Sequence, residues 1–451
     1  MARALIDLAP LRSSPQFRRL WIGRSSSGLG MMMTLVAVMY QVWQQTGSTA
    51  WTGGVGLAEA LPVVGFGLFA GSLADRGDRR RIYLIATIGQ AVCSAALAVQ
   101  GFAGWLPPAG VLALVAAQSA ASAAAGPPSR AFLRRLLPTD QVAAGLALNT
   151  IGFQAALLLG PALAGLVLGS LGVGSCYLVD AITYLAAFSG AFGLPPMPPD
   201  GEPASPGLAG VREGLGFLLR SPRVRGALLT DLAATVLSFP VSLFPLINAE
   251  RFGGNPRTLG LFMTAMAIGG VTASALSGTF TRLARPGLVM IVSAGAWGAA
   301  LALFGIAPGP WLGFACLLVA GAADSISVVS RGTVIQLHTP DALLGRVVAA
   351  EQIVGQAGPN LGNLRGGLVA SATSGVTALV SGGLLCVATV AAVAATIPEL
   401  RLPGPAGSRS RSGVLADEGP DGDPQASDRQ PDGSQHALER DGGPGPGAAI
   451  P

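Results

Sequence analysis

Long apolar segments alternate with short polar or charged stretches over most of the chain, and each segment has about 20 residues or more. A stretch of that length crosses the ~30 Å hydrocarbon layer of a bilayer as a helix. Lipid cannot satisfy backbone polar groups, and no alternating pattern typical of a barrel strand is present, so the segments must be helical. We therefore predict an all-α polytopic membrane protein with twelve transmembrane helices, at residues 17–44, 51–73, 81–103, 108–136, 141–170, 173–194, 224–249, 257–281, 286–307, 310–337, 342–371 and 375–397.

Recurring landmarks predict that these helices form two related bundles of six. A duplicated unit of this kind is typical of transporters whose halves are parallel repeats. The landmarks are Ser129-Arg130 with Ser330-Arg331 at an offset of 201 residues, Gly160-Pro161 with Gly358-Pro359 at 198, and Gly71 with Gly278 at 207. We predict an N-terminal six-helix bundle over 1–195, a central loop over 196–222, a C-terminal six-helix bundle over 223–400 and a polar, disordered tail over 401–451.

Composition excludes several other classes of protein. The 451 residues are 51% hydrophobic and 11% charged, whereas soluble domains contain about 25% charged residues. The chain has no lysine, which a phosphate-binding Walker loop requires, so ATP hydrolysis is excluded. Two histidines and four widely separated cysteines predict neither a metal site nor a disulfide framework. We expect no enzyme activity, no cofactor, no metal and no nucleic-acid partner.

The distribution of arginine predicts the orientation in the membrane. Most arginines lie in the loops at one side of the twelve predicted helices, while Arg251 and Arg257 lie at the other side. Loops rich in basic residues face the cytoplasm. We therefore expect both termini to be cytoplasmic and the protein to reside in the plasma membrane.

A mixed-charge stretch, GSLADRGDRR, begins at Gly71 between the second and third apolar segments. It resembles the signature between helices 2 and 3 of the major facilitator superfamily. Asp78 replaces the commoner glycine, and this variant resembles the branch of drug and siderophore exporters that includes macrolide and enterobactin efflux pumps. The resemblance implies an inner-gate role for Gly71, Asp75, Arg76, Arg79 and Arg80. A basic loop that only sets topology would explain the arginines but neither Asp75 nor Gly71.

The fifth predicted helix contains a second family-like pattern. Gly152, Gly160, Pro161 and Gly165 are similar to the glycine-rich antiporter motif of the same superfamily, which implies export. The alternative is ordinary helix packing with a proline kink, because glycine and proline are common in membrane helices.

Two acidic residues near the middle of predicted spans indicate a coupling function. A charged side chain is costly in hydrocarbon and is therefore a functional candidate by default. The repeat-related positions of Asp324 and Glu351 are Ala123 and Thr150, so the shared scaffold does not require acids there. We predict that Asp324 and Glu351 carry protons; the alternative is local hydrogen bonding to serine and threonine.

Further charged residues lie within the predicted spans. Arg24 and Asp231 lie at symmetry-related depths in helices 1 and 7, so we predict a cavity pair that forms when the inner side closes. Independent contact of each side chain with the membrane surface is the alternative. Glu59, Asp180 and Arg365 lie towards outer helix ends and are expected to be hydrated or paired there.

The resemblance and the acids together predict a secondary active transporter that works by alternating access. We expect a monomer in the lipid bilayer that exports an amphipathic small molecule, either a drug-like compound or a siderophore, in exchange for protons. Met31, Met32 and Met33 offer an adaptable apolar surface for such a substrate. The alternatives are a non-transporting polytopic membrane protein, such as a membrane enzyme or permease subunit, and a facilitator-type importer.

Overall fold

The protein, as a computed structural model, is described over residues 7–198, 216–277 and 285–402. Within these ranges the side chains at 64, 66–76, 130, 131, 134, 341, 342, 344–346, 348–350, 352, 353 and 356 also lie outside the described set. The predicted tail and most of the predicted central loop therefore fall outside the described residues. The domain boundaries stay predictions.

Twelve predicted spans correspond to twelve long helical segments whose bounds agree with the sequence pattern within a few residues. Short elements accompany them: α1 (Ala9–Ser13), η1 (Thr139–Gln141) and η3 (Pro398–Arg401). The long segments are α2 (Pro15–Thr46), α3 (Thr49–Arg76), α4 (Arg79–Ala103), α5 (Pro108–Leu136), α6 (Val142–Leu171), α7 (Val173–Phe192), α9 (Pro222–Ser238) continued by α10 (Phe244–Arg251), α11 (Pro256–Ala275), α13 (Pro286–Ile306), α14 (Pro310–His338), α15 (Asp341–Ala372) and α16 (Gly375–Thr396).

Local sequence signals set several of these bounds. Proline begins many of the helices, where its missing N–H costs nothing because the first amides have no helical acceptor. The Ser14 hydroxyl caps α2 by accepting from the Phe17 amide at 3.2 Å. Gly47 and Gly104 end α2 and α4 in the left-handed conformation, with φ of 56° and 67°.

The seventh span differs from its prediction, because it is broken and not one continuous helix. α9 ends at Ser238, and a 3₁₀ turn, η2 (Val241–Leu243), separates it from α10. Pro240 has no N–H to donate and disfavours the helical conformation at Phe239, which is extended with φ −67° and ψ 123°. The freed backbone groups find partners on α15: the Ser242 amide donates to Asn363 Oδ1 at 3.0 Å, and Arg365 donates to the Leu237 carbonyl.

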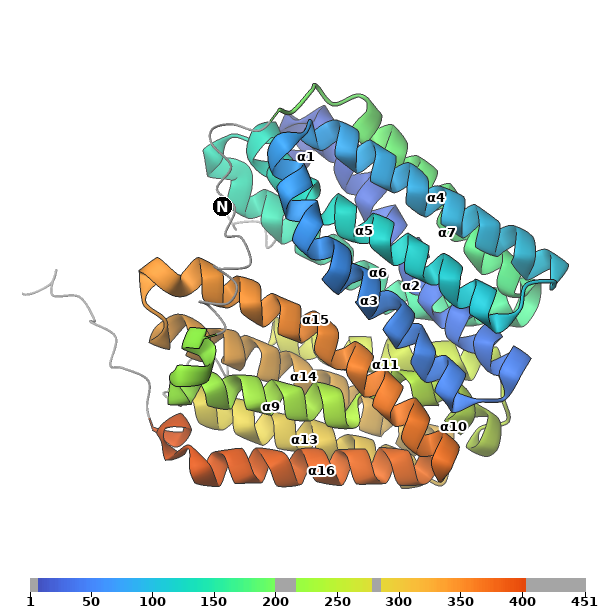
Figure 1. The fold of residues 1–451 in the computed structure, drawn as a ribbon, viewed down its shortest axis with the longest axis vertical. Helices are drawn as coiled ribbons and strands as arrows, with labels where there is room; N and C mark the ends of the chain where they lie inside the picture. Colours follow the sequence, from blue (N-terminus) through green and yellow to red (C-terminus); the bar gives the residue numbers. More distant parts are fainter. Residues whose placement is uncertain (1–6, 199–215, 278–284, 403–451) are drawn as a thin grey trace, which may run out of the picture. The chain divides into compact units, whose positions relative to one another are not determined.

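The helices form two six-helix halves with equivalent packing: the first half contains α2–α7 and the second half contains α9–α16 (Figure 1). Every strong helix contact within the first half recurs in the second. The contact of α2 with α7 corresponds to that of α9 with α16, and α4 with α7 corresponds to α13 with α16. In the same way α3 with α5 corresponds to α11 with α14, α4 with α5 to α13 with α14, and α2 with α6 to α9 with α15. This correspondence confirms the predicted pair of pseudo-symmetric bundles.

The halves meet along two symmetry-related helix pairs, α3 with α15 and α6 with α11. Glycine allows the helix backbones to approach closely there. A Cβ atom at Gly53 would lie 2.8 Å from the Asn363 carbonyl oxygen, and a Cβ atom at Gly165 would lie 3.0 Å from the Pro256 carbonyl oxygen. Thr49 adds a hydrogen bond of 2.8 Å to the Gly367 carbonyl across the first pair. Small residues at such contacts are what helix association in lipid requires.

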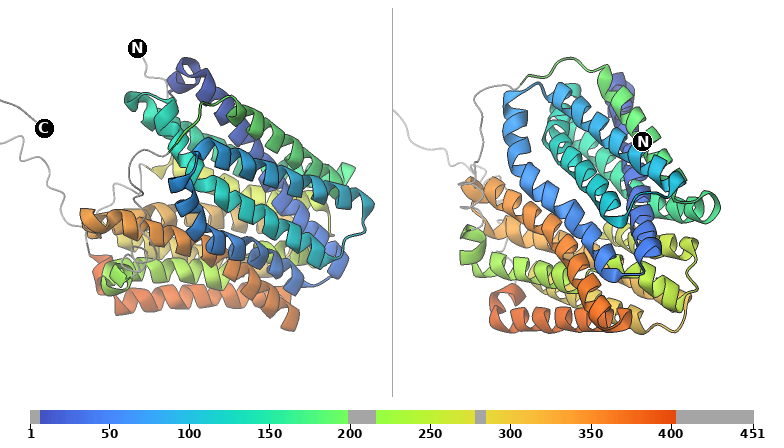
Figure 2. Two further views of the ribbon diagram at one scale, coloured as in Figure 1. Left: turned by 45° about the horizontal axis from the view of Figure 1, so that its top comes forward. Right: turned by 45° about the vertical axis from the view of Figure 1, so that its right-hand side comes forward.

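The two ends of the molecule differ in how far the halves are joined. We call the end that carries Arg79–Arg81, Arg223, Arg225 and Arg285 the arginine-rich end, and the other the opposite end. Nearer the opposite end one hydrophobic cluster contains residues of both halves, such as Val38 and Phe244. At the arginine-rich end the described residues form two separate clusters, one in each half. Figures 1 and 2 show α3 and α15 close at the opposite end and diverging towards the arginine-rich end.

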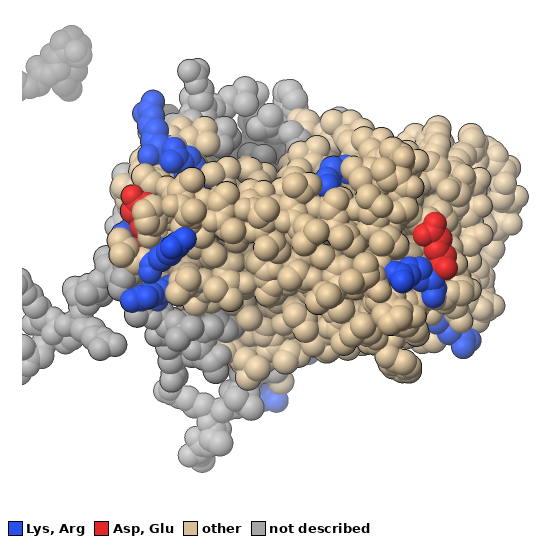
Figure 3. All heavy atoms as spheres, turned by 90° about the horizontal axis from the view of Figure 1, so that it is seen from below, with Lys and Arg blue, Asp and Glu red and all other residues tan. Residues whose placement is uncertain are grey.

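The outer surface has the character of a lipid-facing one. In Figure 3 charged side chains gather towards the two ends, and the broad band between them is almost free of charge. Large apolar side chains are exposed on helices of both halves, for example Ile85, Leu185 and Leu384. Among the described residues, nine segments are long and apolar enough to cross a membrane by themselves, and α2, α3 and α15 complete the twelve. The chain is an integral membrane protein.

Candidate functional site

The loop between α3 and α4 is described only in part. Gly71, Asp75 and Arg76 belong to the last turns of α3, but their side chains lie outside the described residues, so the predicted inner-gate contacts of Asp75 stay a prediction. Arg79 and Arg80 begin α4. Arg80 donates to the Phe192 carbonyl at the end of α7, with its guanidinium 5.7 Å from the Phe192 ring centre.

Asp78, which replaces the commoner glycine of this motif, accepts two backbone hydrogen bonds. Its Oδ1 accepts from the Arg80 amide at 2.9 Å and so caps α4. The same oxygen accepts from the Met197 amide at 2.9 Å, and Arg79 donates back to the Met197 carbonyl at 3.0 Å. Asp78 therefore fixes the start of α4 to the segment that follows α7.

The helix 5 motif lies on α6 and packs against two helices. Gly160 faces α2, where a Cβ would come 2.5 Å from that of Met32, and Gly152 faces Ser25 of the same helix. Gly165 lies against Pro256 and Gly260 of α11 in the second half, and the Pro161 carbonyl oxygen lies against Gly260. These contacts give the four residues a packing role and place two of them at the contact between halves.

A buried charge cluster joins three helices of the second half. Arg331 of α14 donates through Nε to Glu351 Oε1 of α15 at 3.0 Å, and through Nη1 to Asp231 Oδ1 of α9. We call Asp231, Arg331 and Glu351 the Arg331 cluster. The side chains of Arg331 and Asp231 are 10% and 6% exposed, so little solvent screens the pair. The interactions are charge-assisted hydrogen bonds in a region of low dielectric.

Asp324, the other predicted proton carrier, lies close to this cluster without bonding to it. It precedes Arg331 by seven residues, or about two helical turns, on the same face of α14. Arg331 and Asp231 are within electrostatic range of its carboxylate. Among the described residues it forms no hydrogen bond or ion pair. Glu351 therefore contacts Arg331, and no direct contact joins it to Asp324.

The predicted cavity pair of Arg24 and Asp231 is not formed in this conformation. Asp231 contacts Arg331 instead. Arg24 lines a cavity of about 260 Å³ in the first half, which we call the Arg24 cavity, together with Tyr83, Gln90 and Asn149. Pairing of Arg24 with Asp231 on closure of the inner side stays a prediction.

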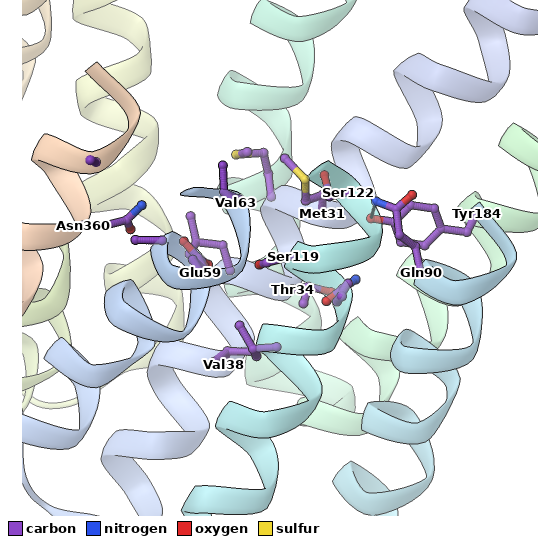
Figure 4. A pocket seen from close by; sticks show the side chains of 16 residues that line it. Met31, Thr34, Val38, Glu59, Val63, Gln90, Ser119, Ser122, Tyr184 and Asn360 are labelled. Carbon is purple, nitrogen blue, oxygen red and sulfur yellow. Dashed lines mark hydrogen bonds between the residues drawn. The ribbon is translucent and has the colours of Figure 1, made fainter. Parts of the chain in front are cut away.

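A second cavity, of about 230 Å³, lies between the first half and α15 (Figure 4). Glu59 of α3 lines it, and we call it the Glu59 cavity. Its polar lining comes from Thr34, Gln90, Gln118, Ser119, Ser122, Tyr184 and Asn360, and its apolar lining includes Met31, Met32, Leu35, Val38 and Val63. Met31, Gln90, Ser122 and Tyr184 also line the Arg24 cavity, so the two are adjacent.

Asp180 lies deeper in the protein than its sequence position indicates. The sequence predicts it near an outer helix end, hydrated or paired; it is fully buried, and its partners are hydrogen-bond donors. Its Oδ2 accepts from Thr34 at 2.9 Å, Ser94 at 2.6 Å and Gln118 at 3.1 Å, which brings together α2, α4, α5 and α7. Gly30 faces Oδ1, and any side chain there would collide with the carboxylate. Thr34, Ser94 and Gln118 are polar residues within apolar spans, which is a signal of a buried polar group. The sequence does not show that all three side chains point towards Asp180.

Metal binding finds no support in the described part of the chain. No group of three or more histidine, cysteine, aspartate or glutamate side chains there is placed to hold a metal ion. The four cysteines are free.

Comparison with known proteins places this architecture in a family. The family model for transmembrane secretion effectors, a group within the major facilitator superfamily, matches residues 6–407. The enterobactin exporter EntS of Shigella boydii serotype 18 is 29% identical over 401 residues, covering 85% of this chain and 92% of the relative. The EntS proteins of Shigella flexneri and Escherichia coli O139:H28 match with the same identity and coverage.

Solved structures show the same fold at lower sequence identity. The D323A mutant of the nucleoside transporter NupG is 16% identical with a TM-score of 0.66, covering 86% of this chain and 99% of that one. A POT family transporter in complex with 5-aminolevulinic acid is 12% identical with a TM-score of 0.69, covering 86% and 97%. The chain therefore belongs to the transmembrane secretion effector family of the major facilitator superfamily and is a membrane transporter of small molecules.

Proposed function

We propose that this transporter exports an amphipathic small molecule in exchange for protons, by alternating access between its two halves. The Arg331 cluster is the observation that carries this proposal. One guanidinium lies between two carboxylates, and a third, that of Asp324, is within electrostatic range. One positive charge balances only one of three carboxylates, and an unbalanced buried charge is costly, so proton uptake by this group is favoured.

The position of the cluster supports coupling to movement of the halves. Glu351 belongs to α15, which packs against α3 of the first half. On the same helix, Gly367 accepts the hydrogen bond from Thr49 that joins the halves. Protonation of Glu351 would weaken its attraction to Arg331 and free the arginine-rich half of α15 to move. The joined opposite end and the divided arginine-rich end support this mechanism, because alternating access requires a state that is closed at one end and open at the other.

Direction and substrate class rest on the relatives. Those proteins are named as exporters of enterobactin, a name that supports export and a siderophore or drug-like cargo here. The arginine-rich end faces the cytoplasm in our proposal, because basic loops are retained on that side. This orientation opens the present conformation towards the cytoplasm, where an exporter loads its substrate, and we propose that one monomer suffices.

Everted membrane vesicles test the proposal directly. Uptake of a compound panel that includes enterobactin and amphipathic amines is measured with and without an imposed pH gradient. We expect gradient-driven uptake of at least one compound by the wild type. Glu351→Gln and Asp324→Asn should lose the response to the gradient while retaining exchange down a concentration gradient. Glu250→Gln, an exposed acid at the opposite end, is the matched control. Full gradient response in both neutralised variants would contradict the proposal.

A further inference from the structure

Glu59 is an acidic side chain that has no partner among the residues that the structure describes. Within the described part of the chain its carboxylate forms no hydrogen bond and no ion pair. None of the sixteen residues that line its cavity is basic. Figure 4 shows Glu59 on α3 at the side of the cavity nearer Asn360, with Gln90 and Tyr184 at the other side.

The other described acids within the membrane have protein partners or a nearby cation. Asp180 accepts three hydrogen bonds from neighbouring helices, and Asp231 and Glu351 share Arg331. Asp324 has Arg331 within electrostatic range. Removing a carboxylate from water without such a partner is unfavourable. Among the described acids within the membrane, Glu59 therefore stands apart, and the cavity that it lines has room for a partner that enters from outside.

The walls of the cavity define the shape of that partner. Met31, Met32, Val38 and Val63 provide an apolar surface, and methionine adapts to ligands of varied outline. Uncharged polar groups face the ligand beyond this surface: the Gln90 amide, which donates to the Tyr184 hydroxyl at 3.4 Å, and Ser119. Such a lining suits a mainly apolar molecule with a few polar atoms.

The adjacent Arg24 cavity limits the charge of the partner. Arg24 is partly buried, and its guanidinium has no ion-pair partner among the described residues. Met31, Gln90, Ser122 and Tyr184 form a wall common to both cavities, so a positive charge lies at the far side of that wall from Glu59. A ligand with a single basic group next to Glu59 fits this arrangement, whereas a second basic group towards Arg24 would be repelled.

We propose that Glu59 binds the protonated amine of an amphipathic substrate that carries one positive charge. This inference rests on the proposed transport function and narrows its substrate class from drug-like compounds or siderophores to monobasic amphiphiles. The amine donates to the Glu59 carboxylate, and the apolar body lies against the methionine and valine side chains of α2 and α3.

Equilibrium binding to the purified full-length protein tests this inference without any gradient. The probes are dansylcadaverine, an amphipathic primary amine, and its N-acetyl derivative, which has nearly the same shape but no charge. We expect the wild type to bind the amine at least about tenfold more tightly, the order of one charge-assisted hydrogen bond. Glu59→Gln should bind both probes equally, Glu59→Asp should keep most of the preference, and the control Glu250→Gln should behave as wild type.

Two results would overturn the inference. One is an equal affinity of the wild type for both probes, or binding of neither. The other is an undiminished amine preference in Glu59→Gln, which would place the amine elsewhere. If Glu59→Gln keeps the preference but loses gradient-driven transport, Glu59 is a proton carrier instead. Binding requires no proton gradient, so its outcome is separate from the vesicle test of proton-coupled export.

Discussion

The two halves of this transporter share a helix arrangement but place their charges differently. In the first half Glu59 and Arg24 line adjacent cavities, and neither has an ion-pair partner among the described residues. In the second half Asp231 and Glu351 both contact Arg331. A charge without a partner in a cavity is available to a ligand, and a group of carboxylates that shares one guanidinium favours the uptake of a proton. We therefore propose that the first half mainly binds the substrate and that the second half couples transport to protons.

The internal repeat sharpens this contrast. Equivalent helix pairs pack together in both halves, so the scaffold itself is symmetric. At the positions of Asp324 and Glu351, however, the first half has Ala123 and Thr150. Its own buried acid, Asp180, is held by neutral hydrogen-bond donors rather than by a guanidinium. The halves therefore differ in the chemistry of their buried charges while sharing one helix packing.

Removal of Arg331 is the largest expected change, because it eliminates the cation that holds the second-half cluster together. We expect Arg331→Gln to reduce gradient-driven transport to background and to lower the free energy of unfolding by about 3–5 kcal/mol, the cost of an uncompensated buried charge. Thermal unfolding in detergent, followed by size-exclusion chromatography, measures the second effect. Arg331→Gln combined with Asp231→Asn should recover part of the stability. A double variant no more stable than the single one would show that the cluster is not electrostatic in origin.

Asp180 provides the corresponding test in the first half. We expect Asp180→Leu to destabilise the protein by about 1–3 kcal/mol, because Thr34, Ser94 and Gln118 would lose their shared acceptor. Asp180→Asn keeps one acceptor oxygen and should cost less. The same unfolding assay measures both. If Asp180→Asn left stability unchanged but abolished the response to a pH gradient, the first half would also contain a coupling acid, and the contrast between the halves would fail.

The sequence predicted the helices well but not the orientation of their side chains. Span lengths and proline or glycine ends are local signals, so the bounds agree within a few residues. The break at Pro240 also had a local signal, which the long apolar run around it obscured. The contact between Asp231 and Arg331 depends on the rotation of α9 against α14, which is set by packing along both helices. The burial of Asp180 and the position of Glu59 in a cavity depend on packing in the same way.

The smallest expected effect concerns the loop between α3 and α4. Asp78→Gly restores the commoner family residue, removes the acceptor for the Arg80 and Met197 amides, and should lower stability by about 1 kcal/mol or less. Asp140→Ala, an exposed acid at the same end without a capping hydrogen bond, is the control. A shift in unfolding temperature no larger than that of the control would show that Asp78 contributes little to fixing α4.

The most direct measurement of the division between halves compares Glu59→Gln and Glu351→Gln with two assays on each protein. One assay is equilibrium binding of dansylcadaverine against its N-acetyl derivative, and the other is gradient-driven uptake in everted vesicles. We predict a crossover: Glu59→Gln loses the amine preference, and Glu351→Gln keeps it but no longer responds to the pH gradient. If both variants lost the same property, or if the pattern were reversed, the assignment of binding to the first half and coupling to the second would be contradicted.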